Sequence, residues 1–147
     1  MHSIAVRCIL IVVFVAVSSQ KIMAQQKSDF TPPVSYYDIH VYFDVNDEQS
    51  FESAKSLHAE LRKKFPQMPI YNLVPQPIGP HPMPMFEAHL MNSLEFGQVI
   101  SFLCTNRRDH SILVHPHTGN GLLDHSHHHL WMGTPLQLDL SIFNRLH

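Results

Sequence analysis

The stretch from Tyr36 to Asp44, YYDIHVYFD, alternates apolar and polar residues and is rich in aromatic and β-branched side chains. Such alternation is typical of a β-strand with one buried face. Apolar residues then recur at steps of three and four up to Phe65, which predicts an amphipathic helix that Asn46 or Asp47 caps and that ends before Pro66. The folded part of the chain is therefore expected to begin with a strand followed by a helix.

The remaining pattern continues this alternation of strands and helices. A cap at Asn92 or Ser93 predicts a second amphipathic helix. The other expected elements are a proline-interrupted edge strand over Ile70–Ile78, a turn over Gly79–Pro84, strands over Met85–Leu90 and Ser111–His115, and a loop and tail from Pro116 onward. This order is the ferredoxin-like βαββαβ arrangement of the α+β class, an antiparallel sheet with two helices on one face.

Residues 1–24 have the order of a secretory signal peptide. An early cation, Arg7, precedes the apolar run CILIVVFVAV, and small residues follow at Ser19 and Ala24, where cleavage would fit. The apolar run is shorter than the roughly 20 residues of a membrane span, so no stable span is expected and a signal anchor is the alternative. We therefore expect a secreted chain with a signal peptide over 1–24, a linker over 25–34 and one domain over 35–147.

Charge and cysteine content exclude two classes of protein. Without residues 1–24, eight Lys and Arg stand against twelve Asp and Glu, so the formal charge is −4 and a nucleic-acid surface is not expected. Cys104 is then the single cysteine, which rules out an intramolecular disulfide. Cys104 falls in the apolar pattern of the second helix, so we expect a buried thiol.

Side chains alternate between the faces of a strand, and this parity gathers polar groups on the open face of the sheet. If Ile39 faces the helices, His40 faces the open side. By the same alternation, Glu87 and His89 of the third strand and His115 of the fourth are expected on that side. In the ferredoxin-like topology the first strand lies between the third and the fourth, so these side chains are expected to be neighbours.

A histidine in the turn before the third strand, His81, is placed to close over the same region. His40, His81 and His115 with the carboxylate of Glu87 form the ligand set of a non-haem iron site that leaves positions open for substrate and oxygen. Zinc accepts similar ligands, so residue types alone leave the metal open. The structural alternatives are a surface role for His40, turn hydrogen bonds for His81 and an ion pair for Glu87.

At these residues the chain resembles the DOPA 4,5-dioxygenase family over Tyr36 to about Ile142. The motifs that carry the resemblance are HVYFD from His40, GPHP with His81, NR at Asn106 and Arg107, ILVHPHTG with His115, DHSHHHLWMG with His125 and His128, and PLQLDLSI. The resemblance implies a ferredoxin-like homodimer that cleaves the ring of a catechol in the extradiol manner with O2 and non-haem iron. A signal peptide departs from the cytoplasmic members that we would expect, so the catechol need not be DOPA.

The resemblance also suggests roles around the metal. His125 and His128 match motif positions, and a near-neutral pKa suits His125 for taking and returning a proton. Arg107 is a candidate to bind a substrate carboxylate, although a cation at a helix C-terminus has the same appearance. Trp131 is a candidate for the pocket wall, with a core position as the alternative.

Two other functions fit the same residues. Seven of the 13 histidines lie between Asp109 and Gly133, so the chain could be a secreted histidine-rich metal-binding protein without catalysis, which predicts several metals per chain. It could also be a dimeric interaction module whose open sheet face pairs with a second chain, which predicts no tightly bound metal.

Overall fold

The computed structural model describes residues 34–145. The predicted signal peptide and residues 25–33 of the predicted linker lie outside the described residues. The elements in chain order are β1 (Tyr37–Tyr42), α2 (Glu48–Lys64), β2 (Met85–Leu90), α3 (Ser93–Asn106), β3 (Ile112–Pro116), α4 (Gly121–Ser126), β4 (Leu130–Met132) and the 3-10 helix η1 (Leu140–Arg145). No helix in the described part is long and apolar enough to cross a membrane.

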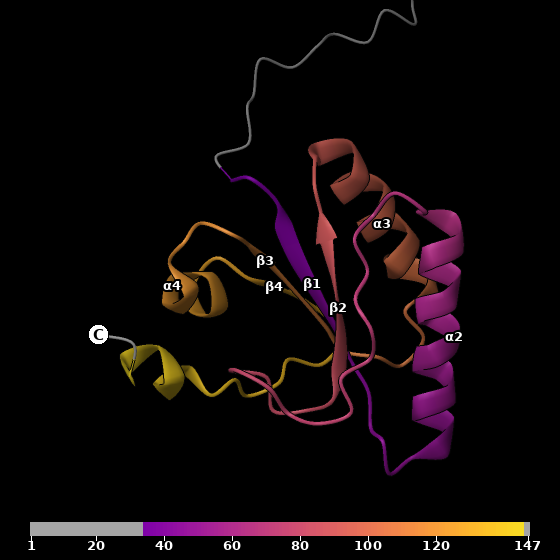
Figure 1. Ribbon diagram of the computed structural model, residues 1–147, viewed down its shortest axis with the longest axis horizontal. Helices are drawn as coiled ribbons and strands as arrows, with labels where there is room; N and C mark the ends of the chain where they lie inside the picture. The colour runs from indigo at the N-terminus through magenta and orange to yellow at the C-terminus, as the bar shows by residue number, and fades with distance from the viewer. Residues whose placement is uncertain (1–33, 146–147) are drawn as a thin grey trace, which may run out of the picture. The chain divides into compact units, whose positions relative to one another are not determined.

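The four strands form one antiparallel sheet in the order β2-β1-β3-β4. Helices α2 and α3 lie on one side of this sheet, while α4 and the C-terminal η1 lie on the other (Figure 1). This arrangement confirms the expected α+β fold with two helices on one face. The central position of β1, between β2 and β3, brings the polar faces of three strands together.

Local capping explains where both long helices begin. The carboxylate of Asp47 accepts hydrogen bonds from the backbone N–H groups of Gln49 and Ser50. The side-chain oxygen of Asn92 accepts from the N–H of Glu95, whose own carboxylate accepts from the N–H of Met91 at 2.6 Å. The bonds to Asp47 and Asn92 satisfy donors that the first helical turn leaves unpaired, and the bond from Met91 ties the preceding residue to the same turn. Both caps are among the predicted ones.

The main core lies between the sheet and the two helices, and it contains Ile39, the residue that strand parity placed on that face. Its fully buried members are Ile39, Val41, Phe86, Ala88, Leu90 and Ile112 from the strands and Leu57, Leu61, Val99 and Leu103 from the helices. Burial of each large aliphatic or aromatic side chain stabilises the fold by about 2 kcal/mol. A stable core on this face leaves the opposite face free to carry polar groups.

Two sequence predictions about the sheet edges are wrong. Ile70–Ile78 forms isolated antiparallel bridges along β2, at Ile70–Ala88 and Val74–Met85, rather than a continuous strand. Pro75 and Pro77 within it have no N–H to donate to a ladder. The region after Pro116 is not only loop and tail, because it contains α4 and the short strand β4.

Cys104 is exposed, whereas the sequence predicted burial. Helix α3 buries Val99 and Leu103 as its core-facing residues. The residue after Leu103 is turned by about a quarter of a helical turn away from that face, which explains the exposure.

Candidate metal centre

A pocket of about 660 Å³ opens on the sheet face that carries His40 and His115. Its walls come from the polar face of the sheet, the extended segment that runs along β2, α4 and the end of the chain, and they include His40, His81, His115, His125 and Phe143. This volume lies within the range of about 300–1,000 Å³ that small-molecule sites occupy in proteins.

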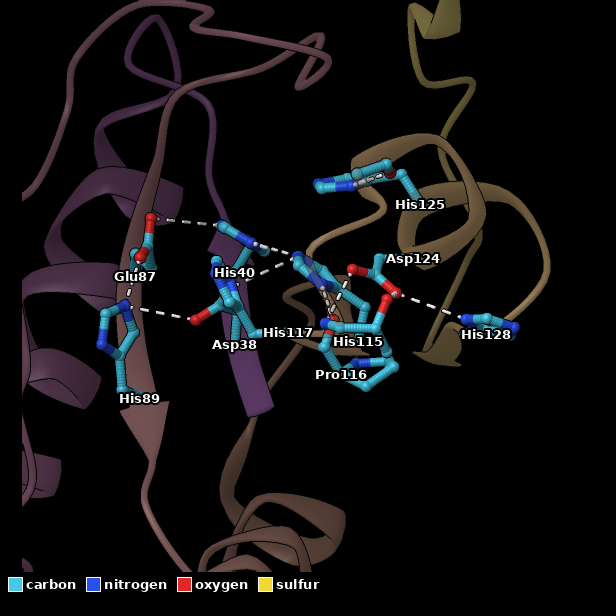
Figure 2. A network of polar contacts seen from close by, with 12 residues as sticks. Asp38, His40, Glu87, His89, His115, Pro116, His117, Asp124, His125 and His128 are labelled. Carbon is cyan, nitrogen blue, oxygen red and sulfur yellow. Dashed lines mark hydrogen bonds and ion pairs between the residues drawn. The ribbon is translucent and has the colours of Figure 1, made fainter. Parts of the chain in front are cut away.

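Three histidines from three different elements meet in this pocket. His40 of β1, His115 of β3 and His125 of α4 each offer a ring nitrogen, and the three nitrogens lie within 4.8 Å of one another. The Nε2 atoms of His40 and His115 are 3.0 Å apart, and the ring centres of His115 and His125 are 4.1 Å apart. Figure 2 shows the ring of His125 above the pair formed by His40 and His115.

Hydrogen bonds on the outer side of the rings fix which nitrogen is free. Nδ1–H of His115 donates to the carbonyl oxygen of Pro116 at 2.9 Å, and Nδ1–H of His125 donates to that of Gly121 at 2.8 Å. The Nε2 atom of each ring therefore carries a lone pair toward the pocket, the form that binds a metal. Nδ1 of His40 is buried with no hydrogen-bond partner among the described residues, and Glu87 Oε2 lies 3.9 Å from it.

The cluster also keeps its imidazoles neutral. Burial, together with the neighbouring histidines, lowers the pKa of His40 well below its ordinary value. Burial lowers the pKa of His115 to about 4 and also lowers the pKa of His125. At neutral pH the cluster is therefore a set of uncharged nitrogen donors, which is the protonation state that metal binding requires.

His81 lies against this group without belonging to it. Its ring centre is 4.1 Å from that of His40, and its Nδ1 is hydrogen-bonded to the hydroxyl of Tyr42 at 2.7 Å. Burial lowers the pKa of His81 to about 3 and raises the pKa of Tyr42. The structure thus brings the predicted ligand His81 into the pocket but puts His125 in the three-nitrogen group.

A second group of metal-ligand type borders the histidine cluster and consists of Asp38, Glu87 and His89. Nε2 of His89 is 2.6 Å from Glu87 Oε1 and 3.2 Å from Asp38 Oδ1. Asp38 Oδ2 lies 3.9 Å from Nε2 of His115, and burial raises the pKa of Asp38. Figure 2 shows these three side chains on the β1 and β2 side of His115.

Asp124 holds the loop that presents α4 to the pocket. Its carboxylate accepts hydrogen bonds from the N–H and the hydroxyl of Thr118, at 3.0 and 2.6 Å, and lies 3.3 Å from Nδ1 of His128. Burial opposes ionisation here, but the hydrogen bonds from Thr118 and His128 outweigh it and lower the pKa of Asp124. This ionised anchor fixes the start of the helix that carries His125.

The structure places three predicted site residues away from the pocket lining. His128 lies beyond Asp124, with 44% of its side chain exposed. The guanidinium of Arg107 follows α3 and donates to the carbonyl oxygens of Arg108 and His110. Trp131 stacks on Tyr42 at 5.8 Å and packs against Leu113 and Leu138. Arg107 therefore lies at the C-terminus of a helix, and Trp131 packs against apolar residues. These are the alternatives that the sequence left open for the two residues.

Sequence reasoning gave no role to three side chains at the site. Strand alternation places Asp38 and Tyr42 on the same face of β1 as His40, but alternation alone gives neither side chain a role. Phe143 packs its ring 5.2 Å from that of His125. It comes from η1, and a Cβ on Gly121 would lie only 2.6 Å from its ring, so this contact depends on a tertiary fit without a local pattern.

The metal-free fold is expected to weaken in acid. Burial lowers the pKa of His81 to about 3 and of His115 to about 4, so between these values and the ordinary 6.5 the unfolded chain binds protons that the folded chain does not. The stability from each group is complete above its unfolded pKa and is lost as pH falls toward the folded pKa, by about 2 kcal/mol at pH 5.

Urea unfolding of chelator-treated protein at pH 7 and pH 5 measures this loss. A His81→Leu variant is expected to show a smaller difference between the two pH values, because one suppressed titration is removed. Equal free energies of unfolding at both pH values would contradict a neutral histidine cluster.

The comparisons with known proteins agree with this fold. The model of the Dopa 4,5-dioxygenase family matches residues 37–142. A protein of Botryotinia fuckeliana, named only as an uncharacterized 21.2 kDa protein, is 39% identical over 85% of this chain and 75% of its own length. The DOPA 4,5-dioxygenase of Amanita muscaria is 34% identical over 74% of this chain, and the match spans 49% of that protein, about half its length.

A solved structure has the same fold. The crystal structure of a candidate dioxygenase from Nostoc punctiforme superposes with a TM-score of 0.73 at 31% identity, covering 82% of this chain and all of the other.

Proposed function

Because this chain belongs to the Dopa 4,5-dioxygenase family, we propose that it opens the ring of a catechol with O2, inserting both oxygen atoms beside the diol to give a ring-opened semialdehyde. The single observation that carries the proposal is the group of three neutral imidazoles in a pocket of about 660 Å³. Extradiol cleavage needs a metal with nitrogen or oxygen ligands and open positions for small molecules.

The residues present fit a divalent transition metal. Nε2 of His40 is hydrogen-bonded to Nε2 of His115 at 3.0 Å, so a metal would displace the proton between them, and the outer nitrogens of His115 and His125 are held by carbonyl oxygens. The donor set suits iron(II) and also zinc, and we propose iron because the family reaction consumes O2. Iron(II) held there would supply Lewis acidity toward the catechol oxygens and a path for electrons from the catechol to O2, with no net oxidation of the metal.

The geometry supports a different division of roles from that proposed on sequence grounds. His40, His115 and His125 are the metal-holding group, with the carboxylate of Glu87 beyond His40. His81 is then available for proton transfer, with its Nε2 taking a proton from a catechol hydroxyl and returning it to the product. The hydroxyl of Tyr42 is hydrogen-bonded to Nδ1 of His81 at 2.7 Å and can donate or accept as that proton moves.

The apolar part of the pocket suits an aromatic ring. Val74, Ile78 and Met85 line it together with Phe143, whose ring lies beside that of His125. These side chains exclude water from the reacting face of a bound ring and orient it toward the histidines.

Secretion and dimerisation remain part of the proposal. The signal-peptide pattern of residues 1–24 supports secretion, and the resemblance to the family supports a homodimer. An extracellular location would favour an extracellular catechol as substrate.

The test is the metal content of the anaerobically purified protein, followed by oxygen uptake with a panel of catechols. We expect about one iron per chain, catechol-dependent uptake and a yellow ring-opened product. Several weakly held metals per chain without oxygen uptake would instead support a metal-binding protein. Metal-free protein that neither binds added iron nor consumes oxygen would support an interaction module.

A further inference from the structure

One side of the pocket is negatively charged. Asp38 and Glu87 both line it, and their carboxylates lie next to the histidine group. Glu87 Oε2 is 3.9 Å from His40 Nδ1, and Asp38 Oδ2 is 3.9 Å from His115 Nε2. Neither Lys nor Arg occurs among the described residues that line this pocket. The predicted carboxylate-binding residue Arg107 is engaged by the carbonyl oxygens of Arg108 and His110 instead.

The hydrogen bonds among Asp38, Glu87 and His89 leave one oxygen of Asp38 without a partner among the described residues. Nε2 of His89 lies 2.6 Å from Glu87 Oε1, a separation that requires a proton between the two atoms. That single N–H cannot also serve Asp38 Oδ1, which is 3.2 Å away and has no hydrogen-bond partner within the described part of the chain. The other oxygen, Oδ2, lies 3.6 Å from Nδ1 of the half-exposed His117, and because Asp38 is only 7% exposed, solvent does little to compensate the rest of its charge.

This protonation pattern favours an organic cation over a second metal ion. A metal bound by His89 would have to displace the proton that Nε2 donates to Glu87 and would break that hydrogen bond. An ammonium group instead needs only acceptors, and the carboxylates of Asp38 and Glu87 supply them. Tyr71, which also lines the pocket, has its hydroxyl 3.4 Å from Nδ1 of His89 and adds an aromatic ring beside the charges.

We propose that Asp38 and Glu87 form an ammonium subsite, so that the preferred substrate is a catechol with a cationic amine on its side chain and catechols with only a carboxylate are disfavoured. This inference rests on the proposed catechol-cleaving function. At neutral pH an alkylamine is charged, and its attraction to two carboxylates in a partly desolvated pocket strengthens binding. A substrate carboxylate would meet the same charges without a cation to pair with, and this repulsion provides the discrimination.

The experiment uses three catechols that differ in the end of the side chain: dopamine, ethylcatechol and dihydroxyphenylacetate. Their affinities for the iron-loaded protein are measured by anaerobic calorimetry, so that no turnover occurs. We expect dopamine to bind about tenfold tighter than ethylcatechol and dihydroxyphenylacetate about tenfold weaker. In Asp38→Asn the ratio of dopamine to ethylcatechol affinity is expected to fall to about two or less. Glu52→Gln, an exposed carboxylate that pairs with Lys55, is the matched control and keeps the wild-type ratio.

The outcomes separate this proposal from the function on which it rests. Equal affinities for the three catechols, with ring cleavage intact, would overturn the subsite and leave the function standing, and this comparison needs no variant. Absence of binding and cleavage for every catechol would overturn both. The protein could instead bind a second equivalent of iron or zinc per chain that Asp38→Asn loses. This result would show that Asp38, Glu87 and His89 hold a metal and would overturn the ammonium subsite.

Discussion

Replacement of His115 by alanine is expected to abolish metal binding and, with it, oxygen consumption. His115 is the centre of the candidate metal group: its Nε2 lies 3.0 Å from that of His40, and its ring centre lies 4.1 Å from that of His125. Loss of even a hydrogen-bonding partner of a ligand costs about 10–100-fold in metal affinity, and loss of the ligand itself should cost more. Iron content should fall from about one equivalent to less than about a tenth after desalting.

The fold should survive this change, since the main core between the sheet and the two helices does not include His115. Circular dichroism and a cooperative unfolding transition check this point. His127→Ala is the matched control, because His127 is an exposed member of the histidine-rich stretch outside the pocket and should keep its iron. His40→Ala should lose iron as His115→Ala does. If either ligand variant kept its iron, the three-histidine centre would be wrong and dispersed binding by the histidine-rich stretch would be favoured.

The sequence predicted the sheet well because strand alternation depends on burial of each residue in turn. Val41 and Phe86 are cross-strand partners that both face the helices, as the parity of their strands required. The strand β4 was missed, since Leu130–Met132 is three residues long and pairs only with the edge of β3. So short a segment carries no periodic signal, and its state depends on the neighbour that it meets.

The histidines of the candidate site that lie on strands could be predicted in the same way as the sheet. Parity placed His40 and His115 on one face of adjacent strands, and the structure has them side by side. His125 could not be positioned in this way, because α4 has six residues and is held against the sheet by the contacts of Asp124 with Thr118. The resemblance supplied His125 as a functional residue, and only the tertiary arrangement supports its exchange of roles with His81.

Replacement of His81 by glutamine is expected to lower kcat by about 10²-fold or more with iron content unchanged. His81 lies outside the three-nitrogen group, while its Nδ1 is hydrogen-bonded to Tyr42 at 2.7 Å and Nε2 is left to exchange a proton with substrate. In the free protein burial keeps the pKa of His81 at about 3. A bound catecholate, being negative, raises the pKa of His81 and makes it a better base when it is needed.

Tyr42→Phe separates proton transfer from metal binding. It removes the hydroxyl that orients His81 but leaves the imidazole, so kcat should fall by about tenfold and the pH profile of kcat should shift. If the two side chains act as one unit, the double variant should be about as slow as His81→Gln alone. A loss of iron in His81→Gln, without any effect of Tyr42→Phe on kcat, would return His81 to the role of metal ligand. The combination of iron content and kcat therefore decides between the two roles that sequence and structure suggest for this histidine.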